Sequence, residues 1–306
     1  MKNIPYVNDE VVTRPEQYYI FDWDDNIIHM PTKIRMEHLQ ADGSWAMEDL
    51  TTAEYALARN DTKHYRAPAD GGWNEAFKYF SDAPDANYFL CDTIAALEKI
   101  EHGEKPGPSY RALKKTLREG RLFAIVTARG HSEKTLELAV RVFIKYALSD
   151  YERAEMMSNL RGYRKHFDHV SEFGTDAEEL DYYLSQCQFS GVMQRKYFDR
   201  VKTDPIYLER IKENPSARFP ELAKEYAIRD FVEHIFHTLK KTGNVGKPVS
   251  IGFSDDDSAN VKTISSYIED YLSKRFKGFK FVVYDTSDRT LEKGRKVCVT
   301  VPETLI

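Results

Sequence analysis

The sequence predicts an α/β protein with a doubly wound, mainly parallel sheet and an inserted, largely helical cap region. Short β-prone apolar segments recur along the chain, and segments of helical periodicity separate them. Three of the apolar segments break off abruptly at acidic or hydroxyl residues. Because helices that join successive strands produce parallel sheets, this alternation favours an open α/β architecture. The 306 residues suffice for one large domain and a smaller one.

The first half of the chain contains one clear strand and several weaker elements. The apolar run 18–21 predicts a buried strand, and residues 32–38 and 44–47 flank a turn-like Ala41-Asp42-Gly43, which indicates a β-hairpin. Thr51 or Thr52 caps a helix that ends near Arg59. Residues 60–88 lack clean periodicity, so we expect loops and short helices there. A further helix is predicted over 94–101.

The second half repeats the helix and strand alternation more regularly. Helix 109–119 ends at Gly120 and leads into the continuous apolar strand 122–126. Pro220 is suited to the first turn of a long helix that extends to residue 241. The remaining expected elements are helix 133–147, a mostly helical stretch 150–220 with one β-like piece at 189–193, strand 249–254, helix 259–274 and strand 279–284.

These elements divide the chain into a discontinuous core and two insertions. We expect the core to comprise residues 1–29, 107–147 and 220–306. The segment 30–106 is longer than a hairpin and one crossover helix require, so it is predicted to form a flap and a cap. Residues 148–219 are predicted to form a second, helical insertion. Caps exclude water and contact the leaving group, so they select the substrate.

Composition excludes several classes of protein. The 44 Lys and Arg residues against 49 Asp and Glu give a formal charge of −5, which disfavours nucleic acid as a partner. No run approaches the roughly 20 apolar residues that span a bilayer, and the first residues lack the apolar core of a secretory signal. We therefore expect a cytoplasmic protein with no membrane partner.

Functional side chains follow three of the predicted strands. Asp22 and Asp24, Thr127, and Asp255 and Asp256 each stand at a strand's carboxyl end. Ligands of open parallel sheets bind at this edge, so we expect these side chains to share one cleft. Clustered carboxylates repel one another unless a cation neutralises them, and a ligand set made of oxygen atoms favours Mg²⁺. Since Mg²⁺ held by carboxylates usually accompanies a phosphate group, the predicted partner is a small phosphate ester.

These residues also resemble the motifs of a known family. Phe21-Asp22-Trp23-Asp24, Ile125-Val126-Thr127 and Ile251-Gly252-Phe253-Ser254-Asp255-Asp256 are similar, in that order, to the first, second and fourth motifs of the haloacid dehalogenase-like hydrolase superfamily. The resemblance covers about 15–30, 108–147 and 220–286. It departs from the commonest pattern after Asp24, where Asp25-Asn26-Ile27 replaces Gly followed by Thr or Val, and the orientation of Asp25 is left open.

The resemblance implies a role for each matched residue. Asp22 is the expected nucleophile, which forms an aspartyl-phosphate, and Asp24 is the expected acid and base. Asp22, the backbone carbonyl of Asp24, and Asp255 and Asp256 are the expected Mg²⁺ ligands. Thr127 is expected to donate its hydroxyl to the phosphoryl oxygens, within a phosphate-binding segment that includes Ala128 and Arg129. Asp257 is the expected helix cap, although a register shift among the three acids stays open.

Several assignments have alternatives. The third family motif is a Lys or Arg that steadies the phosphoaspartate, and Lys224 is favoured over Arg229 because it lies earlier in its helix. Lys247 is expected at the opposite edge of the sheet. Arg129 could bind the substrate's phosphate or a carboxylate, or it could pair with a nearby acid. His131 is more often a helix-start residue than a catalyst.

The resulting functional hypothesis is a Mg²⁺-dependent phosphohydrolase that cleaves a phosphate monoester through an aspartyl-phosphate. Two alternatives stay open. A polynucleotide 3′-phosphatase is similar in the Thr127-Ala128-Arg129 segment and the paired aspartates, but the acidic charge balance and the lack of a phosphate-binding loop of the kinase type disfavour it. A non-catalytic module that binds a phosphorylated ligand is the other, although such a module has no need of a nucleophile. The leaving group and the oligomeric state are not predicted.

Overall fold

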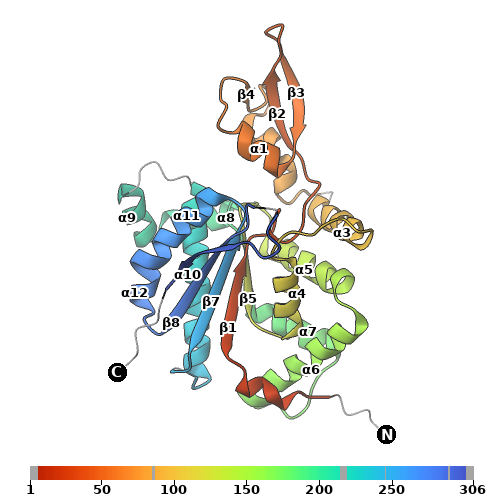
Figure 1. Ribbon diagram of the computed structural model, residues 1–306, viewed down its shortest axis with the longest axis vertical. Coiled ribbons are helices and arrows are strands. Elements are labelled where there is room, and N and C mark those ends of the chain that lie inside the picture. Colours follow the sequence, from red (N-terminus) through yellow and green to blue (C-terminus); the bar gives the residue numbers. More distant parts are fainter. Residues whose placement is uncertain (1–5, 85–86, 214–218, 245, 289, 301–306) are drawn as a thin grey trace.

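A six-stranded, mainly parallel sheet forms the centre of the computed structural model, which describes residues 6–84, 87–213, 219–244, 246–288 and 290–300 (Figure 1). The strand order is β6-β5-β1-β7-β8-β9, and only β9 runs antiparallel to its neighbour. The predicted α/β class with a mainly parallel sheet is therefore confirmed. The strands of this sheet are β1 (Glu16–Phe21), β5 (Phe123–Thr127), β6 (Gln188–Gly191), β7 (Val249–Asp255), β8 (Phe279–Asp285) and β9 (Arg295–Val299).

The register of the sheet brings the three predicted strand ends to one edge. Phe21 of β1 is paired with Ile125 of β5 on one side and with Ser254 of β7 on the other. Because the three strands are parallel, the residues that follow them leave the sheet side by side. Asp22, Thr127 and Asp255 therefore lie at neighbouring positions on its carboxyl edge.

Helices cover the sheet in two layers. α10 (Phe219–Lys241) and α11 (Ser258–Tyr267) pack on the face that includes Ile20, Ile251 and Phe281. α4 (Tyr110–Arg118) and α5 (Glu133–Ala147) cover the other face, but they do so only over β1, β5 and β6. After α11 the chain continues through a π-helical turn, η3 (Ile268–Leu272), into α12 (Ser273–Arg275), where the sequence predicted one helix over 259–274.

The segment that was predicted as a second insertion belongs largely to the core. β6 extends the main sheet beside β5, with Phe189 paired to Ile125, so the interpretation of 148–219 as a separate helical unit is wrong for this strand. The β-like piece predicted at 189–193 is this strand, but its short length and its Ser190 and Gly191 did not indicate that it joins the main sheet. The helices of this segment are α6 (Asp150–Phe167), α7 (Asp176–Gln186), α8 (Arg195–Lys202) and α9 (Pro205–Glu213). Both α6 and α7 begin with a capping box.

Residues 34–80 form a small-sheet unit that projects beyond the carboxyl edge of the main sheet, at the top of Figure 1. The predicted hairpin is confirmed, with its turn at Gly43, whose φ of 83° suits glycine. The expectation of a largely helical insertion is wrong here, because β-strand alternation in these residues builds a three-stranded sheet. The unit consists of β2 (Ile34–Leu39), β3 (Trp45–Leu50), α1 (Thr52–Ala58), β4 (Tyr65–Arg66), α2 (Gly72–Ala76) and η2 (Lys78–Phe80).

The boundary of this unit also differs from the predicted 30–106. α3 (Tyr88–Glu101) packs on α5 and contributes Phe89 and Leu97 to the core beneath the main sheet. At the N-terminus, η1 (Asp9–Thr13) packs on α6. Among the residues that the structure describes, no helix combines the length and the apolar character needed to cross a bilayer.

Candidate active site

Three carboxylates converge at the carboxyl edge of the sheet. Asp22 follows β1, Asp255 ends β7, and Asp256 begins the loop to α11. One carboxylate oxygen from each of the three lies within 4.8 Å of the other two. The backbone N–H of Asp22 donates to the carbonyl of Ser254 at 3.0 Å, which extends the pairing of β1 and β7 up to the cluster. The predicted convergence of Asp22 and Asp255 is thus found in the structure.

Lys224 supplies the positive charge of this cluster. Its Nζ lies 2.7 Å from Asp22 Oδ1 and 2.6 Å from Asp255 Oδ2. The side chain comes from the second turn of α10 and is 1% exposed. Burial lowers the pKa of Lys224, but the two carboxylates outweigh it and hold that pKa above its ordinary value. Lys224 therefore stays charged and links the two strand ends.

The cluster carries more negative charge than its lysine neutralises. Burial raises the pKa of Asp22 to about 8, with Lys224 opposing the shift and Asp255 adding to it. Burial also raises the pKa of the half-buried Asp256, and the charges of Asp22 and Asp255 raise it further. When all three carboxyl groups are ionised, the single ammonium group leaves two negative charges uncompensated, which a bound cation would offset. Carboxylate oxygens with this charge fit a hard divalent cation such as Mg²⁺.

Asp255 is held in place by groups of its own loop and helix. The backbone N–H of Asp257 donates to Asp255 Oδ1 at 2.9 Å, and Asn260 Nδ2 lies 3.2 Å from the same oxygen. Asn260 lies in the first turn of α11 and was not identified from the sequence, although a polar residue one turn after the paired acids could have indicated it. Asp257 also accepts a hydrogen bond from the N–H of Ala259, as expected of a helix cap.

Thr127 ends β5, next to the end of β1, which Asp22 follows. The residue is 1% exposed, and the backbone N–H of Arg129 donates to its Oγ1 at 3.4 Å. The carbonyl of Thr127 accepts a hydrogen bond from the N–H of Val192, the residue after β6. This bond holds the start of the loop that follows β5. Ala128 is exposed between two buried neighbours. The geometry leaves the phosphate-binding roles of Thr127 and Ala128 as predictions.

Arg129 is bound to Asp24. Its Nε lies 2.7 Å from Asp24 Oδ2 and its Nη2 lies 2.6 Å from Asp24 Oδ1, so the pair is bidentate. The guanidinium carbon lies 4.3 Å from the ring centroid of Phe80 and 4.9 Å from that of Phe89. Of the alternatives for Arg129, the structure shows the pairing with a nearby acid. Its contact with the substrate's phosphate stays a prediction.

The ion pair of Arg129 and Asp24 belongs to a hydrogen-bond network that also includes Thr32 and Asp92. Arg129 Nη2 donates to Thr32 Oγ1 at 3.0 Å, and Thr32 Oγ1 donates to Asp92 Oδ2 at 2.5 Å. The side chain of Asp24 is not among the three clustered carboxylates. Its backbone carbonyl, the predicted metal ligand, accepts from the N–H of Asn26 at 2.5 Å. Its part in metal binding therefore stays a prediction.

The alternatives to Lys224 lie elsewhere. Arg229 binds Asp204 through both Nη atoms, at 3.1 and 2.5 Å, so it faces α9 and does not contact the carboxylate cluster. Lys247 lies 3.8 Å from Glu16 at the amino end of β1, at the edge opposite the cluster, as the sequence predicted. Only Lys224 of the three candidates therefore reaches the carboxylates of Asp22 and Asp255.

Besides Phe80 beneath Arg129, side chains at the two ends of α1 connect the small-sheet unit to the loops of the cluster. Thr52 Oγ1, at the start of α1, donates to Asp25 Oδ2 at 2.5 Å, and Asp25 Oδ1 lies 2.6 Å from His29 Nδ1. Arg59, which follows α1, donates from Nη2 to Asp257 Oδ2 at 2.9 Å. Each acid stands one residue after a member of the predicted site. The sequence did not indicate either contact, because it does not place α1 over these loops.

His131 is buried behind the Arg129 loop. Its ring stacks on Phe89 with centroids 4.5 Å apart, and its Nδ1 has no hydrogen-bond partner among the described residues. Burial and the charge of Arg129 lower the pKa of His131 to about 3, whereas Asp82 opposes the shift. A neutral, buried histidine agrees with the interpretation of His131 as a helix-start residue and not as a catalyst.

Comparisons of the chain with protein-family models, with curated proteins and with solved structures each found no match.

Proposed function

We propose that the protein is a Mg²⁺-dependent phosphohydrolase that cleaves small phosphate monoesters through an aspartyl-phosphate on Asp22. One observation carries this proposal: Asp22, Asp255 and Asp256 come together at the carboxyl edge of the sheet with Lys224 bound between the first two. A strand-end carboxylate that contacts a buried lysine beside a divalent-cation site supports nucleophilic attack on a phosphoryl group, because a bound cation would favour the ionised form of Asp22.

The donor set fits the implied metal. Asp22, Asp255 and Asp256 would hold Mg²⁺, and the backbone carbonyl of Asp24 is a further candidate ligand. Each of these donors is an oxygen atom, and the two uncompensated charges match a divalent cation. When bound, the cation would draw a phosphoryl oxygen to the cluster and offset its negative charge.

In the proposed reaction, Asp22 acts as the nucleophile and Asp24 as the acid and base. The Asp22 carboxylate attacks phosphorus, the bond to the leaving oxygen breaks, and Asp24 supplies the proton that this oxygen needs. Water then attacks the phosphorus of the aspartyl-phosphate, gives its proton to Asp24, and releases phosphate and the Asp22 carboxylate. Thr127 would donate its hydroxyl to a phosphoryl oxygen. Arg129 donates one hydrogen bond to each oxygen of Asp24, which fixes the carboxyl group and leaves a second lone pair on each oxygen for the proton.

A substrate panel tests the proposal directly. Hydrolysis of p-nitrophenyl phosphate and of small phosphorylated metabolites is measured with MgCl₂ and with EDTA, for wild type and for Asp22→Asn. Asp61→Asn is a matched control, because Asp61 is an exposed aspartate of the small-sheet unit. We expect turnover that requires Mg²⁺, is lost in Asp22→Asn and is kept in Asp61→Asn. Turnover that survives EDTA or Asp22→Asn, or no turnover of any ester, would contradict the proposal.

A further inference from the structure

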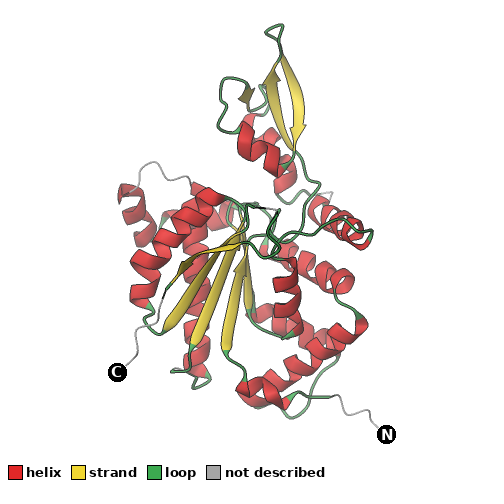
Figure 2. Cartoon of the chain, viewed as in Figure 1, coloured by secondary structure: helices red, strands yellow, loops and turns green. Residues whose placement is uncertain are grey.

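One half of the main sheet has a face without a helix. In Figure 2 the strands β1, β7 and β8 are turned to the viewer, and no described helix lies in front of β7 and β8. The sequence of β7 matches this arrangement, since Val249, Ile251 and Phe253 point to the helices behind, and Ser250 and Gly252 alternate with them. Small and polar residues at these positions indicate a face built for solvent or a ligand.

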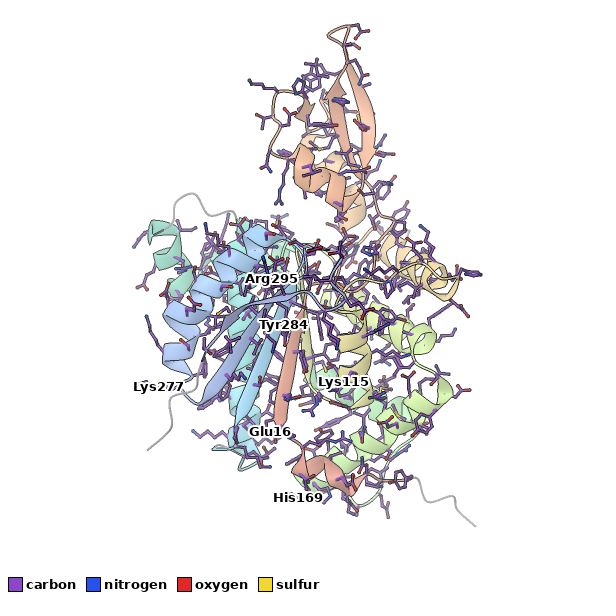
Figure 3. The ribbon with its side chains drawn as sticks, viewed as in Figure 1. Glu16, Lys115, His169, Lys277, Tyr284 and Arg295 are labelled. Atoms are coloured by element: carbon purple, nitrogen blue, oxygen red, sulfur yellow. The ribbon has the colours of Figure 1, made fainter. Side chains whose placement is uncertain are left out.

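Two tyrosine rings flank a glycine on this face. Gly252 of β7 pairs with Tyr19 of β1, and β8 carries Tyr284 on the other side. A Cβ added to Gly252 would lie 3.0 Å from the Tyr19 ring and 3.9 Å from the Tyr284 ring, so both rings lean over the glycine. Figure 3 labels Tyr284 toward the carboxyl ends of the strands and Glu16 at their amino ends. The Tyr19 ring thus covers the glycine, and both rings line a pit beside it.

The pit has the size of an aromatic ring system, and polar side chains available for hydrogen bonding line it. Its volume is about 180 Å³, and a cavity of roughly 150 Å³ is known to accept benzene. Gln17 and Ser250 line it, and the side chains of both make no hydrogen bond with any described residue. Amide and hydroxyl groups beside aromatic rings suit a planar heterocycle, which stacks on the rings and forms hydrogen bonds at its edge.

Two lysines border the pit. Lys280 of β8 and Lys296 of β9 are exposed, line the pit, and form no ion pair with any residue of the described ranges. The Nζ of Lys296 lies 5.8 Å from the ring centroid of Tyr284. The one acid at the near end of β1, Glu16, already accepts a hydrogen bond from Tyr18 and lies 3.8 Å from Lys247. The rim of the pit is therefore positive and complements an anionic group.

The pit is separate from the carboxylate cluster. The next residue of β7 on the same face is Ser254, and Ser109 and Asn26 cover it with hydrogen bonds to its Oγ at 2.9 and 3.1 Å. Thr286 completes this network through a 2.9 Å hydrogen bond to Asn26. The four buried residues close the upper end of the open face, so a molecule in the pit does not occupy the proposed active site.

We propose that this open face is a binding site for a free nucleotide. The base stacks against the rings of Tyr19 and Tyr284 in the pit beside Gly252, and its phosphate contacts Lys280 and Lys296. A pit that holds one ring system, with two lysines beside it, matches a single nucleotide unit. A long strand of nucleic acid requires an extended basic track, which the net charge of −5 does not favour. The site is independent of the proposed hydrolase activity.

Titration of the full-length protein with adenosine monophosphate tests the proposal. Binding is measured by isothermal calorimetry in EDTA, so that the nucleotide is not hydrolysed, and adenosine and inorganic phosphate are titrated in parallel. We expect saturable binding of the nucleotide and weaker binding of each fragment. The double variant Lys280→Glu/Lys296→Glu, and separately Tyr284→Ala, should weaken the affinity about tenfold or more, since tenfold corresponds to about 1.4 kcal/mol.

A matched control reverses the charge of two lysines that lie away from the pit. Lys262→Glu/Lys274→Glu changes the net charge equally on α11 and α12, behind the sheet, and should bind the nucleotide as wild type does. Thermal unfolding of each variant establishes that it is folded. The proposal is overturned if wild type shows no saturable binding, or if the variants of the open face bind normally. It is also overturned if Asp22→Asn alone abolishes binding, or if oligonucleotides bind and the free nucleotide does not.

Discussion

Arg129 binds Asp24 with both arms of its guanidinium group, at 2.7 and 2.6 Å, across 105 residues of sequence. The arginine is 1% exposed and lies against the rings of Phe80 and Phe89. A planar fork held in this way fixes both the position and the rotation of the carboxylate. Arg129 is thus a positioning residue for Asp24, the proposed acid and base. A substitution that keeps the positive charge separates the effect of its bidentate geometry from that of its charge.

Replacing Arg129 by lysine should lower kcat by about 100-fold, a typical value for a misplaced general acid. Lysine keeps the charge but loses the bidentate geometry, so KM should change little. Both kinetic constants are measured on p-nitrophenyl phosphate. Arg66→Lys is a control, because Arg66 pairs with Glu37 in the small-sheet unit. Equal kcat for Arg129→Lys and wild type would show that the fork has no part in catalysis.

Lys224→Met should destabilise the metal-free protein by about 3 kcal/mol or more. The substitution removes the cation between two buried carboxylates and leaves their charges uncompensated, a change that typically costs about 3–5 kcal/mol. Urea unfolding in EDTA measures the difference, and MgCl₂ should restore part of it. Lys240→Met, at an exposed position near the end of the same helix, should leave stability almost unchanged. A stability loss shared by both variants would point to the helix and not to the cluster.

Magnesium should raise the unfolding temperature of wild type and leave that of Asp255→Asn unchanged. A ligand that binds the folded state stabilises it in proportion to the logarithm of its concentration above Kd. Asp255 provides one of the three clustered carboxylates, so its amide variant lacks a ligand. Asp285→Asn, at the end of the neighbouring strand β8, serves as the control. Thermal shift is read against MgCl₂ concentration, and an equal response of all three proteins would remove the proposed metal site.

The sequence predicted the core and the carboxylate cluster because both follow from local patterns. Strands with continuous apolar runs predict a parallel sheet, and acids at the carboxyl ends of such strands meet at one edge. Neither step needs knowledge of the insertions. Strand β9 was missed, because Arg295 and Lys296 give it the charged composition of an edge strand, and such strands carry little apolar pattern.

The sequence favoured Lys224 over Arg229 but did not exclude Arg229 as the residue that reaches the carboxylates. Five residues on a helix correspond to a rotation of about 140°, so the two side chains point in different directions. Which of them faces the sheet depends on how α10 packs, and packing is a tertiary property. The partner of Arg129 was undetermined for a related reason. In the predicted fold, Asp24 and a substrate phosphate were equally plausible partners for the Arg129 guanidinium. The sequence also did not indicate that Phe80 and Phe89 lie beside it.

His131 should make the protein less stable as the pH falls from about 6.5 toward 3. Its pKa in the folded state is about 3, and its ordinary value is 6.5, so over this interval the unfolded chain binds a proton that the folded chain does not. Stability then falls by up to about 1.4 kcal/mol per pH unit below 6.5 and is constant above it. The groups that face the ring are Phe89, Arg129 and Asp82.

The measurement compares wild type with His131→Gln. Urea unfolding is followed between pH 4 and 7, and the difference between the two free energies of unfolding isolates the histidine from other titrating groups. The variant should lose the extra slope below pH 6.5. His102→Gln, at an exposed position after α3, should keep it. Parallel pH profiles for wild type and His131→Gln would show that His131 accepts a proton as readily in the folded protein.

Arg59→Ala should loosen the small-sheet unit while the core stays intact. Arg59 and Thr52 hold the two ends of α1 to Asp257 and Asp25, one residue beyond predicted site residues. Both partners of the Arg59 and Asp257 ion pair are about a fifth to a quarter exposed, so the pair contributes roughly 1 kcal/mol or less. Amide hydrogen exchange in 52–59 should therefore accelerate by a factor of about 5 at most, with exchange in β1 and β7 unchanged.

A matched variant separates this ion pair from charge effects within the unit. Arg35→Ala removes an arginine that pairs with Glu75 inside the small-sheet unit and leaves both contacts to the core in place. It should not accelerate exchange in α1. If the unit selects substrates by closing over the cleft, Arg59→Ala should also raise KM more for bulky phosphate esters than for p-nitrophenyl phosphate, because a larger leaving group makes more contacts with the unit. Equal changes of KM for both esters would place substrate selection in the core loops.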